Sequence, residues 1–268
     1  MKLILSLFQG IGMLDNGFTE NGFCVVAAPE KLLSGDIRNF KGMIGKFDGI
    51  IGGSPCQDFS LLNRTPKGNS IEMLWHFCRI VNECKPNWFL LENVLQVPTV
   101  AIDGYHVQRF NLSPNDLGFE QSRNRTFQFG SLDGMILNVF DFKKSDTKQR
   151  IVLASEGKKQ DRRKFDDFCK LQGFNTTPEL DSFTRSAKYQ AVGNGVHLGV
   201  SYVIAKAIWD VATSTNPKTI HNTKVCVCGC GRITTNKKKS ATDACRKRLQ
   251  KNRERALFQY NSIRDGKA

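Results

Sequence analysis

The chain has 268 residues, of which 40% are hydrophobic, so it is long enough for one sizeable α/β core with a small appendage. No stretch approaches ~18 consecutive apolar residues, and the short apolar start does not look like a secretion signal. The composition therefore argues against a membrane protein and favours a cytoplasmic one.

The formal net charge of +14 is concentrated towards the end of the sequence. Residues 215–268 contain 14 Lys or Arg and 3 Asp or Glu, so this segment alone accounts for +11. Such segregation favours a polyanion, such as a nucleic acid, as the partner of the tail. The alternative is a tail that only keeps the protein in solution.

Taken in chain order, short apolar runs alternate with segments of helical spacing. Strands are expected at residues 2–8, 23–28, 47–51, 87–91, 105–112 and 125–130, and helices at 13–20, 71–81 and 196–212, with a further regular segment at 165–174. This alternation is typical of an α/β fold with a mostly parallel, doubly wound sheet.

Residues that could bind a ligand or take part in catalysis follow the first four predicted strands. Gly10 and Gly12 follow the first strand, Glu30 the second, Cys56 the third and Glu92 the fourth. Open α/β sheets bind ligands at the carboxyl ends of their strands, so these positions predict one functional edge. The two glycines would let the backbone approach a cofactor, and Glu30 could bind ribose hydroxyls. A plain turn and a solvated acid are the alternatives.

Cys56 and Glu92 are the strongest candidates for catalytic residues. Cys56 follows Pro55 on a glycine-rich loop, and a cysteine thiol is a strong nucleophile once it is ionised. Glu92 comes after an apolar strand, where a carboxyl group could share a proton with a ring nitrogen. Alternatively, Cys56 packs a turn, and Glu92 pairs with Arg123 or Arg125.

Two further motifs lie in the second half of the core. Arg123 and Arg125 stand on alternate residues at the entrance of a strand, so their side chains should diverge, one towards the functional edge and one towards a phosphate or a loop. Residues 190–196 precede the last predicted helix, where backbone N–H groups and the Asn194 amide would suit a carboxylate. Either motif could also be an ordinary surface loop.

In this order, the motifs resemble those of the cytosine-C5 methyltransferases, over roughly residues 1–212. The resemblance implies a Rossmann-like fold that uses S-adenosylmethionine. It implies that this cofactor is bound by Phe8, Gly10, Ile11, Gly12, Glu30, Asp36, Ile37, Pro55, Asn194 and Val196. One departure is Met13, which stands where the family has a second glycine, and another is the short segment between Glu30 and Gly35.

The resemblance also implies an activity, which is methyl transfer to C5 of a cytosine flipped out of double-stranded DNA. Cys56 would add to C6, Glu92 would hold N3, Arg125 would hold O2 of the base, and Arg123 would hold the catalytic loop. We expect a monomer, and the existence of a nuclease partner stays open. Alternatives are a tRNA cytosine-C5 methyltransferase and a catalytically silent DNA-binding homologue.

On this basis the chain divides into five segments. They are a catalytic and cofactor-binding core (1–130), a short target-recognition region (131–164), a return to the core (165–212), a linker (213–224) and a cysteine-rich basic tail (225–268). The tail contains four closely placed thiols, Cys226, Cys228, Cys230 and Cys245. Four thiols suffice for a structural zinc site in a DNA-contacting module. Reduced cysteines without a metal are the alternative.

Overall fold

The computed structural model describes residues 1–29, 35–59, 68–139, 144–147, 149–213, 224–225, 233–234 and 247. The chain folds into two compact units. The first contains residues 1–40, 112–125 and 137–213, and the second contains residues 41–111, 126–136 and 214–268. Among the described residues, no helix combines the length and apolar character needed to cross a membrane.

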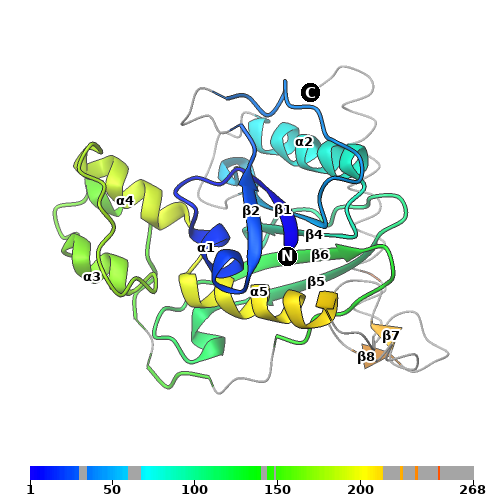
Figure 1. Cartoon of the computed structure of the whole chain (residues 1–268). Helices are drawn as coiled ribbons and strands as arrows, with labels where there is room; N and C mark the ends of the chain where they lie inside the picture. Colours follow the sequence, from blue (N-terminus) through cyan, green and yellow to red (C-terminus); the bar gives the residue numbers. More distant parts are fainter. Residues whose placement is uncertain are drawn as a thin grey trace. The chain divides into compact units, whose positions relative to one another are not determined.

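Six strands form a mixed sheet in the order β2-β1-β3-β4-β6-β5 (Figure 1). Their bounds are Lys2–Leu7 for β1, Phe23–Ala27 for β2, Gly49–Gly53 for β3, Trp88–Asn93 for β4, His106–Leu112 for β5 and Arg125–Ser131 for β6. β1 pairs with β2 and β3 with β4 in parallel, whereas β4 and β6 are antiparallel. The predicted α/β class with a mostly parallel sheet is confirmed.

In the first unit, helix α1 (Met13–Glu20) packs on helix α5 (Leu198–Thr213) beside β1 and β2 (Figure 1). Gly17 makes this close approach possible, because a Cβ atom there would lie 2.4 Å from the backbone of Ser201. The Ser201 hydroxyl donates to the Leu14 carbonyl oxygen across the same contact. The predicted bounds of α1 are confirmed, and α5 begins two residues later than predicted.

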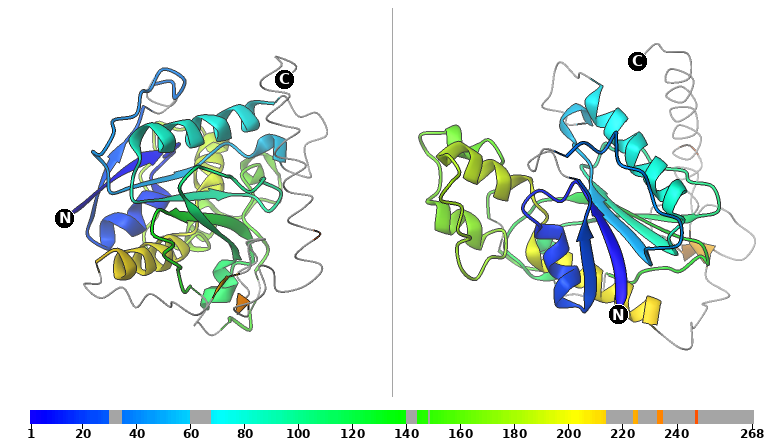
Figure 2. Two further views of the ribbon diagram at one scale, coloured as in Figure 1. Left: turned by 90° about the vertical axis from the view of Figure 1, so that its right-hand side faces the viewer. Right: turned by 45° about the horizontal axis from the view of Figure 1, so that its top comes forward.

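The same unit contains a small lobe built on α3 (Phe165–Lys170) and α4 (Arg185–Asn194), which lie side by side (Figures 1 and 2). Its core is formed by the buried residues Val152, Phe168, Cys169, Tyr189 and Val192. This packing runs across position 164, where the sequence suggested a boundary. α4 was not predicted, because only Tyr189, Val192 and Gly193 of its residues are buried and the apolar period is therefore weak.

In the second unit, β3, β4, β6 and β5 are neighbours in that order, and α2 (Asn69–Cys84) belongs to the same unit (Figure 2). Glycines on the flanking strands make room for aromatic rings of β4. A Cβ atom at Gly49 would lie 2.3 Å from the Trp88 ring, and one at Gly130 would lie 2.1 Å from the Phe89 ring. These contacts fill the core beside the start of β4.

Two short strands, β7 (Lys224–Val225) and β8 (Ile233–Thr234), pair antiparallel in the tail. The predicted zinc ligands Cys226, Cys228, Cys230 and Cys245 lie outside the described residues. Glu30 does so too. Within the described part of the chain, no group of three or more His, Cys, Asp or Glu side chains could hold a metal ion.

Candidate active site

The turn between β1 and α1 has a backbone that only a few residue types adopt readily. Phe8, Gly10 and Gly12 have φ angles of 57°, 60° and 76°, all in the left-handed region. The Gly12 N–H donates to the Gln9 carbonyl oxygen (3.0 Å), which closes the turn. A Cβ atom at Gly10 would meet nothing within 4 Å. The turn therefore presents open backbone at the position predicted for the cofactor.

A buried acid lies behind this turn, and sequence reasoning missed it. Asp15 accepts a hydrogen bond from the Ser6 hydroxyl (2.6 Å), and both residues are buried. Burial raises the pKa of Asp15 to about 6, although the Ser6 hydrogen bond lowers it in part. The available signal was an acidic residue on the helix face of Met13, Leu14 and Phe18.

Asp36 and Ile37, two neighbouring residues that were predicted to bind the cofactor, differ in their exposure. Ile37 is buried, whereas the exposed Asp36 accepts a hydrogen bond from the Arg38 N–H (2.9 Å). The Arg38 guanidinium also pairs with the Asp36 carboxylate at 3.2 Å. The carboxylate of Asp36 thus closes its own turn, and a role in cofactor binding stays a prediction.

In the second unit, the structure brings together the segments that carry Cys56 and Glu92. Gly53, the last residue of β3, is paired in register with Glu92 of β4. A Cβ atom at Gly53 would lie only 3.0 Å from Glu92 Oε2, so the glycine makes room for this carboxylate. Glu92 is 8% exposed and lies within β4 rather than after it, and Cys56 is half-buried with its thiol outside any disulfide.

Two sets of hydrogen bonds fix the loop that carries Cys56. The Asn93 carboxamide nitrogen donates to both the carbonyl oxygen (3.0 Å) and the hydroxyl oxygen (2.9 Å) of Ser54. On the other side, the Asp58 N–H donates to the Ser70 hydroxyl (3.0 Å), and the Ser70 N–H donates to the Asp58 carboxylate (2.8 Å). The loop is therefore joined to β4 at one end and to α2 at the other.

The two arginines of the 121–125 motif diverge, as the sequence suggested. Arg123 is buried, and its guanidinium donates to the carbonyl oxygens of Gly195 (2.6 Å) and Gly193 (2.8 Å). Arg125 donates to the Asn124 carbonyl oxygen (2.9 Å). Arg123 thus holds residues 190–196 of the first unit, which we call the closing motif, while the predicted contacts of both arginines with base and loop stay predictions.

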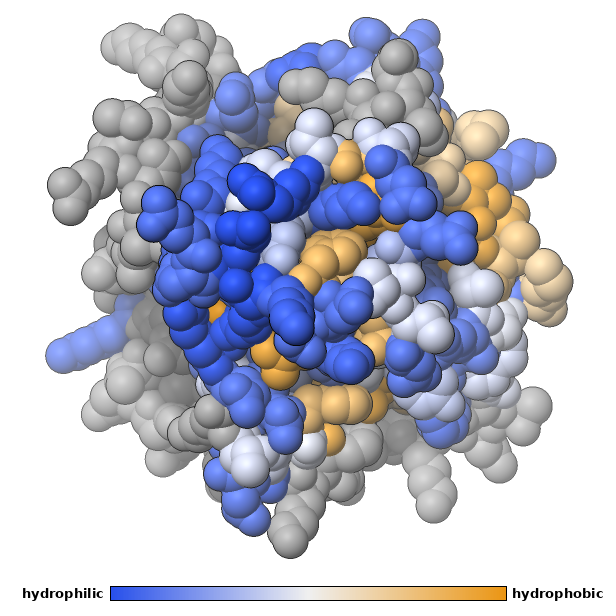
Figure 3. Space-filling view, turned by 90° about the vertical axis from the view of Figure 1, so that its left-hand side faces the viewer, coloured by the Kyte–Doolittle hydropathy of each residue, from blue (hydrophilic) through white to orange (hydrophobic). Residues whose placement is uncertain are grey.

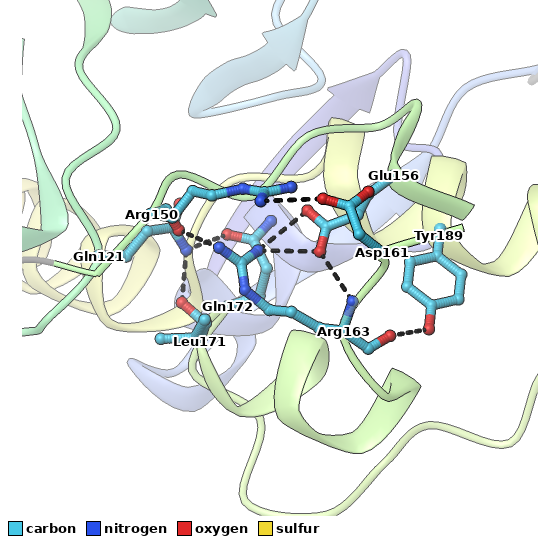
Figure 4. A network of polar contacts seen from close by, with 8 residues as sticks. All are labelled: Gln121, Arg150, Glu156, Asp161, Arg163, Leu171, Gln172 and Tyr189. Carbon is cyan, nitrogen blue, oxygen red and sulfur yellow. Dashed lines mark hydrogen bonds and ion pairs between the residues drawn. The ribbon is translucent and has the colours of Figure 1, made fainter. Parts of the chain in front are cut away.

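The closing motif has a different local structure from the expected one. Asn194 is the last residue of α4 and is exposed, whereas we expected a position at the start of the final helix. Val196 is buried. Gln172 donates to the Val192 carbonyl oxygen (2.7 Å), and Gln121 donates to the Gln172 side chain (2.9 Å). Side-chain hydrogen bonds therefore link the 121–125 motif, the segment around Gln172 and the closing motif. The contact between Gln121 and Gln172 is visible in Figure 4.

A buried ion pair holds the small lobe together (Figure 4). Glu156 is completely buried, and both of its carboxylate oxygens accept from the Arg163 guanidinium, at 3.1 and 2.9 Å. The Tyr189 hydroxyl of α4 donates to the Arg163 carbonyl oxygen, and Arg163 donates to the Arg150 carbonyl oxygen (2.6 Å). The ion pair therefore closes the segment before α3 on itself, and the Tyr189 hydrogen bond joins this segment to α4.

The outer surface of this lobe is polar. Viewed from the side of α3 and α4, hydrophilic side chains surround a narrow strip of apolar ones (Figure 3). The exposed residues of the two helices include Asp166, Asp167, Lys170, Arg185 and Gln190. This surface suits water or a polar partner rather than a lipid phase.

The family model described as "C-5 cytosine-specific DNA methylase" matches residues 2–168. The chain belongs to this family. The match includes Cys56, Glu92 and both arginines, and it ends before the closing motif. Membership confirms the resemblance inferred from the sequence and implies S-adenosylmethionine as the methyl donor.

Similar curated proteins include the Type II methyltransferase M.FnuDI of Fusobacterium nucleatum, which is 33% identical over 176 residues, covering 53% of this chain and 50% of that protein. The Type II methyltransferase M.NgoPII of Neisseria gonorrhoeae is 32% identical over 186 residues, covering 56% of this chain and 54% of that protein. The chain thus spans about half the length of these relatives.

Solved structures of similar fold include Spodoptera frugiperda DNMT2 and the Entamoeba histolytica methyltransferase EhMeth, each with a TM-score of 0.55 and 15% identity. They cover 78% and 80% of this chain, and 100% and 99% of their own chains. At this identity the likeness concerns the fold, and it confirms the predicted methyltransferase-type α/β architecture.

Proposed function

We propose that this member of the family methylates C5 of cytosine in double-stranded DNA, with Cys56 as the nucleophile and Glu92 as the group that holds N3. The observation that carries the proposal is the link between the two segments. Gly53 leaves space for the Glu92 carboxylate, and Asn93 ties the following loop to β4. A thiol and a buried carboxyl group can thereby act on one ring.

The turn after β1 fits S-adenosylmethionine, because Gly10 leaves open space and the left-handed Gly12 opens α1. Phe8, Ile11, Asp36, Ile37, Pro55, Asn194 and Val196 are the further residues that we assign to this cofactor, together with Glu30. S-adenosylmethionine supplies an electrophilic methyl group, which C5 of the base receives.

The residues of the chain act on the base, which must leave the DNA stack to expose C6. The Cys56 thiolate forms a bond to C6, and the electron pair of the C5–C6 double bond moves towards C5. Glu92 holds a proton at N3 and so accepts part of the charge that develops in the ring. After methylation, the C5 proton passes to a solvent base, the double bond re-forms, and the Cys56 thiolate leaves.

Trapping with a DNA oligonucleotide that contains 5-fluorocytosine tests this proposal, because fluorine at C5 blocks the final elimination. The wild type with S-adenosylmethionine should give an adduct that survives denaturation, and Cys56→Ser should give none. Glu92→Gln, which keeps the shape but not the acid, should slow adduct formation. If the wild type binds DNA and methyl donor yet forms no adduct, the mechanism is wrong.

The choice of DNA as substrate is tested separately. Bisulfite sequencing of plasmid and of tRNA from cells that express the chain distinguishes DNA methylation from the tRNA alternative, and the proposal expects new 5-methylcytosine in the plasmid only.

We further propose that Cys226, Cys228, Cys230 and Cys245 bind one zinc ion. Metal analysis of the purified protein should then find about one zinc per chain, and Cys228→Ser should lower it.

A further inference from the structure

The loop that follows Glu92 and Asn93 is held by a side chain from β5. Arg109 donates through one guanidinium nitrogen to the Val97 carbonyl oxygen (2.8 Å) and to the Thr99 hydroxyl (3.3 Å). Its other terminal nitrogen donates to the Leu95 carbonyl oxygen (3.0 Å). The planar guanidinium therefore spans three groups of the loop at once, which a lysine ammonium cannot reproduce.

A second side chain holds the far end of the same loop. Gln128 of β6 is completely buried, and its carboxamide nitrogen donates to the Pro98 carbonyl oxygen (2.9 Å) while its oxygen accepts from the Val100 N–H (2.8 Å). A buried carboxamide in the middle of a sheet is costly unless both of its ends are bonded. Here the backbone of the loop supplies both partners, so residues 95–100 are fixed by β5 and β6 together.

Further hydrogen bonds connect this loop to Asn93 and Ser54, which lie close in sequence to the proposed catalytic residues. The Val97 N–H donates to the Val94 carbonyl oxygen (3.1 Å), and the Val94 N–H donates to the Asn93 side-chain oxygen (2.9 Å). The Asn93 nitrogen in turn holds Ser54, two residues before Cys56. A displacement of the loop would therefore turn the Asn93 carboxamide and release the Cys56 loop from β4.

We propose that Arg109 and Gln128 are positioning residues for the methyl transfer reaction: through residues 94–100 they hold the Asn93 carboxamide, and hence Cys56 and Glu92, in the geometry that attacks the base. This inference rests on the proposed function. Arg109 lies on β5, which carries no predicted catalytic residue. Gln128 lies on β6, whose first residue, Arg125, is the one predicted catalytic residue of that strand. Their effect is on nucleophile placement and not on binding of the methyl donor.

The test measures the rate of adduct formation with the 5-fluorocytosine oligonucleotide in Arg109→Met, Arg109→Lys and Gln128→Leu. Arg79→Met is the matched control, because Arg79 lies in the same unit on α2 and pairs with Glu83 (2.6 Å). Arg109→Met and Gln128→Leu should lower the rate by about ten-fold or more, since small misplacements of reacting groups are costly. Arg109→Lys should fall between, and the control should match the wild type.

The KM for S-adenosylmethionine separates positioning from general damage, and it should stay within about two-fold of the wild type in all four variants. Unchanged adduct rates in both Arg109→Met and Gln128→Leu would overturn the inference, as would an equal loss in Arg79→Met. If Gln128→Leu does not fold, the graded order of wild type, Arg109→Lys and Arg109→Met still decides. Absence of an adduct in the wild type would instead overturn the proposed function.

Discussion

The Asn93 carboxamide nitrogen donates two hydrogen bonds to Ser54, one to the carbonyl oxygen at 3.0 Å and one to the hydroxyl oxygen at 2.9 Å. Both residues are buried, so neither bond competes with solvent. Since Asn93 follows Glu92 and Ser54 comes two residues before Cys56, this one side chain links the segment of the proposed nucleophile to the segment of the Glu92 carboxyl group.

Loss of the hydrogen bonds between Asn93 and Ser54 should lower the rate of methyl transfer, and the size of the loss should depend on which bond is removed. Asn93→Asp keeps the shape but offers no N–H to the Ser54 carbonyl oxygen and places a repelling carboxylate oxygen beside it, so methyl transfer in single-turnover assays should fall by ~100-fold. Ser54→Ala loses only the hydroxyl contact and should fall by less than about ten-fold. Equal losses in the two variants would show that the carbonyl contact is unimportant.

The buried Glu156–Arg163 pair should matter for the stability of the first unit. Glu156→Ala leaves the Arg163 guanidinium, whose side chain is 19% exposed, without its partner, and should lower the free energy of unfolding by about 3–5 kcal/mol. The matched control is Asp161→Ala, which breaks an exposed pair with Arg150 and should cost at most about 1 kcal/mol. Urea denaturation measures both, and similar costs would contradict the importance of burial.

Asp15 should make stability depend on pH. Folding raises its pKa from 3.8 to about 6, so its contribution is fully present below pH 3.8 and is lost as the pH rises through 6. The unfolding free energy of the wild type should therefore fall relative to Asp15→Asn between pH 4 and pH 7, by on the order of 3 kcal/mol. Parallel pH profiles for wild type and Asp15→Asn would contradict the shift.

The close approach of α1 and α5 should not tolerate a single methyl group. Gly17→Ala would place Cβ 2.3 Å from the Ser201 hydroxyl and 2.4 Å from backbone atoms, so the helices must separate, and we expect a loss of about 3 kcal/mol or more in unfolding free energy. Asn16→Ala, on the exposed side of α1, should be neutral or slightly stabilising. Thermal denaturation compares them, and an unchanged Gly17→Ala midpoint would refute the packing argument.

The basic tail should dominate the salt dependence of DNA binding. Residues 215–268 contribute +11 of the net +14, so their deletion should remove phosphate contacts and flatten the plot of log affinity against log salt concentration. Fluorescence anisotropy with one duplex at several salt concentrations measures the slope. A slope equal to that of the full chain would exclude a phosphate-binding role for the tail.

Much of the architecture was predictable, because Gly and Pro mark the strand ends and parallel strands bring their carboxyl ends to one edge. That logic predicted the association of the Cys56 and Glu92 segments. It could not find α4, whose buried face is too narrow to give a period, and it therefore misplaced Asn194 at a helix start. The roles of Arg109 and Gln128 were not predictable, because all of their partners described above except the Thr99 hydroxyl are backbone carbonyl and N–H groups, which every residue type provides.

The way the small lobe is bonded also limits where the chain can be cut when segments are exchanged with a relative. A transplant of residues 131–164 from a related methyltransferase would exchange Glu156 and Arg163 while leaving their companion Tyr189 behind, and it would cut Val152 out of the lobe core. A segment from Arg150 to Asn194 keeps Glu156, Arg163 and Tyr189 together, but Gln121 and Arg123 still bond it from outside. An exchange of this segment must therefore preserve the hydrogen bonds from Gln121 and Arg123 as well.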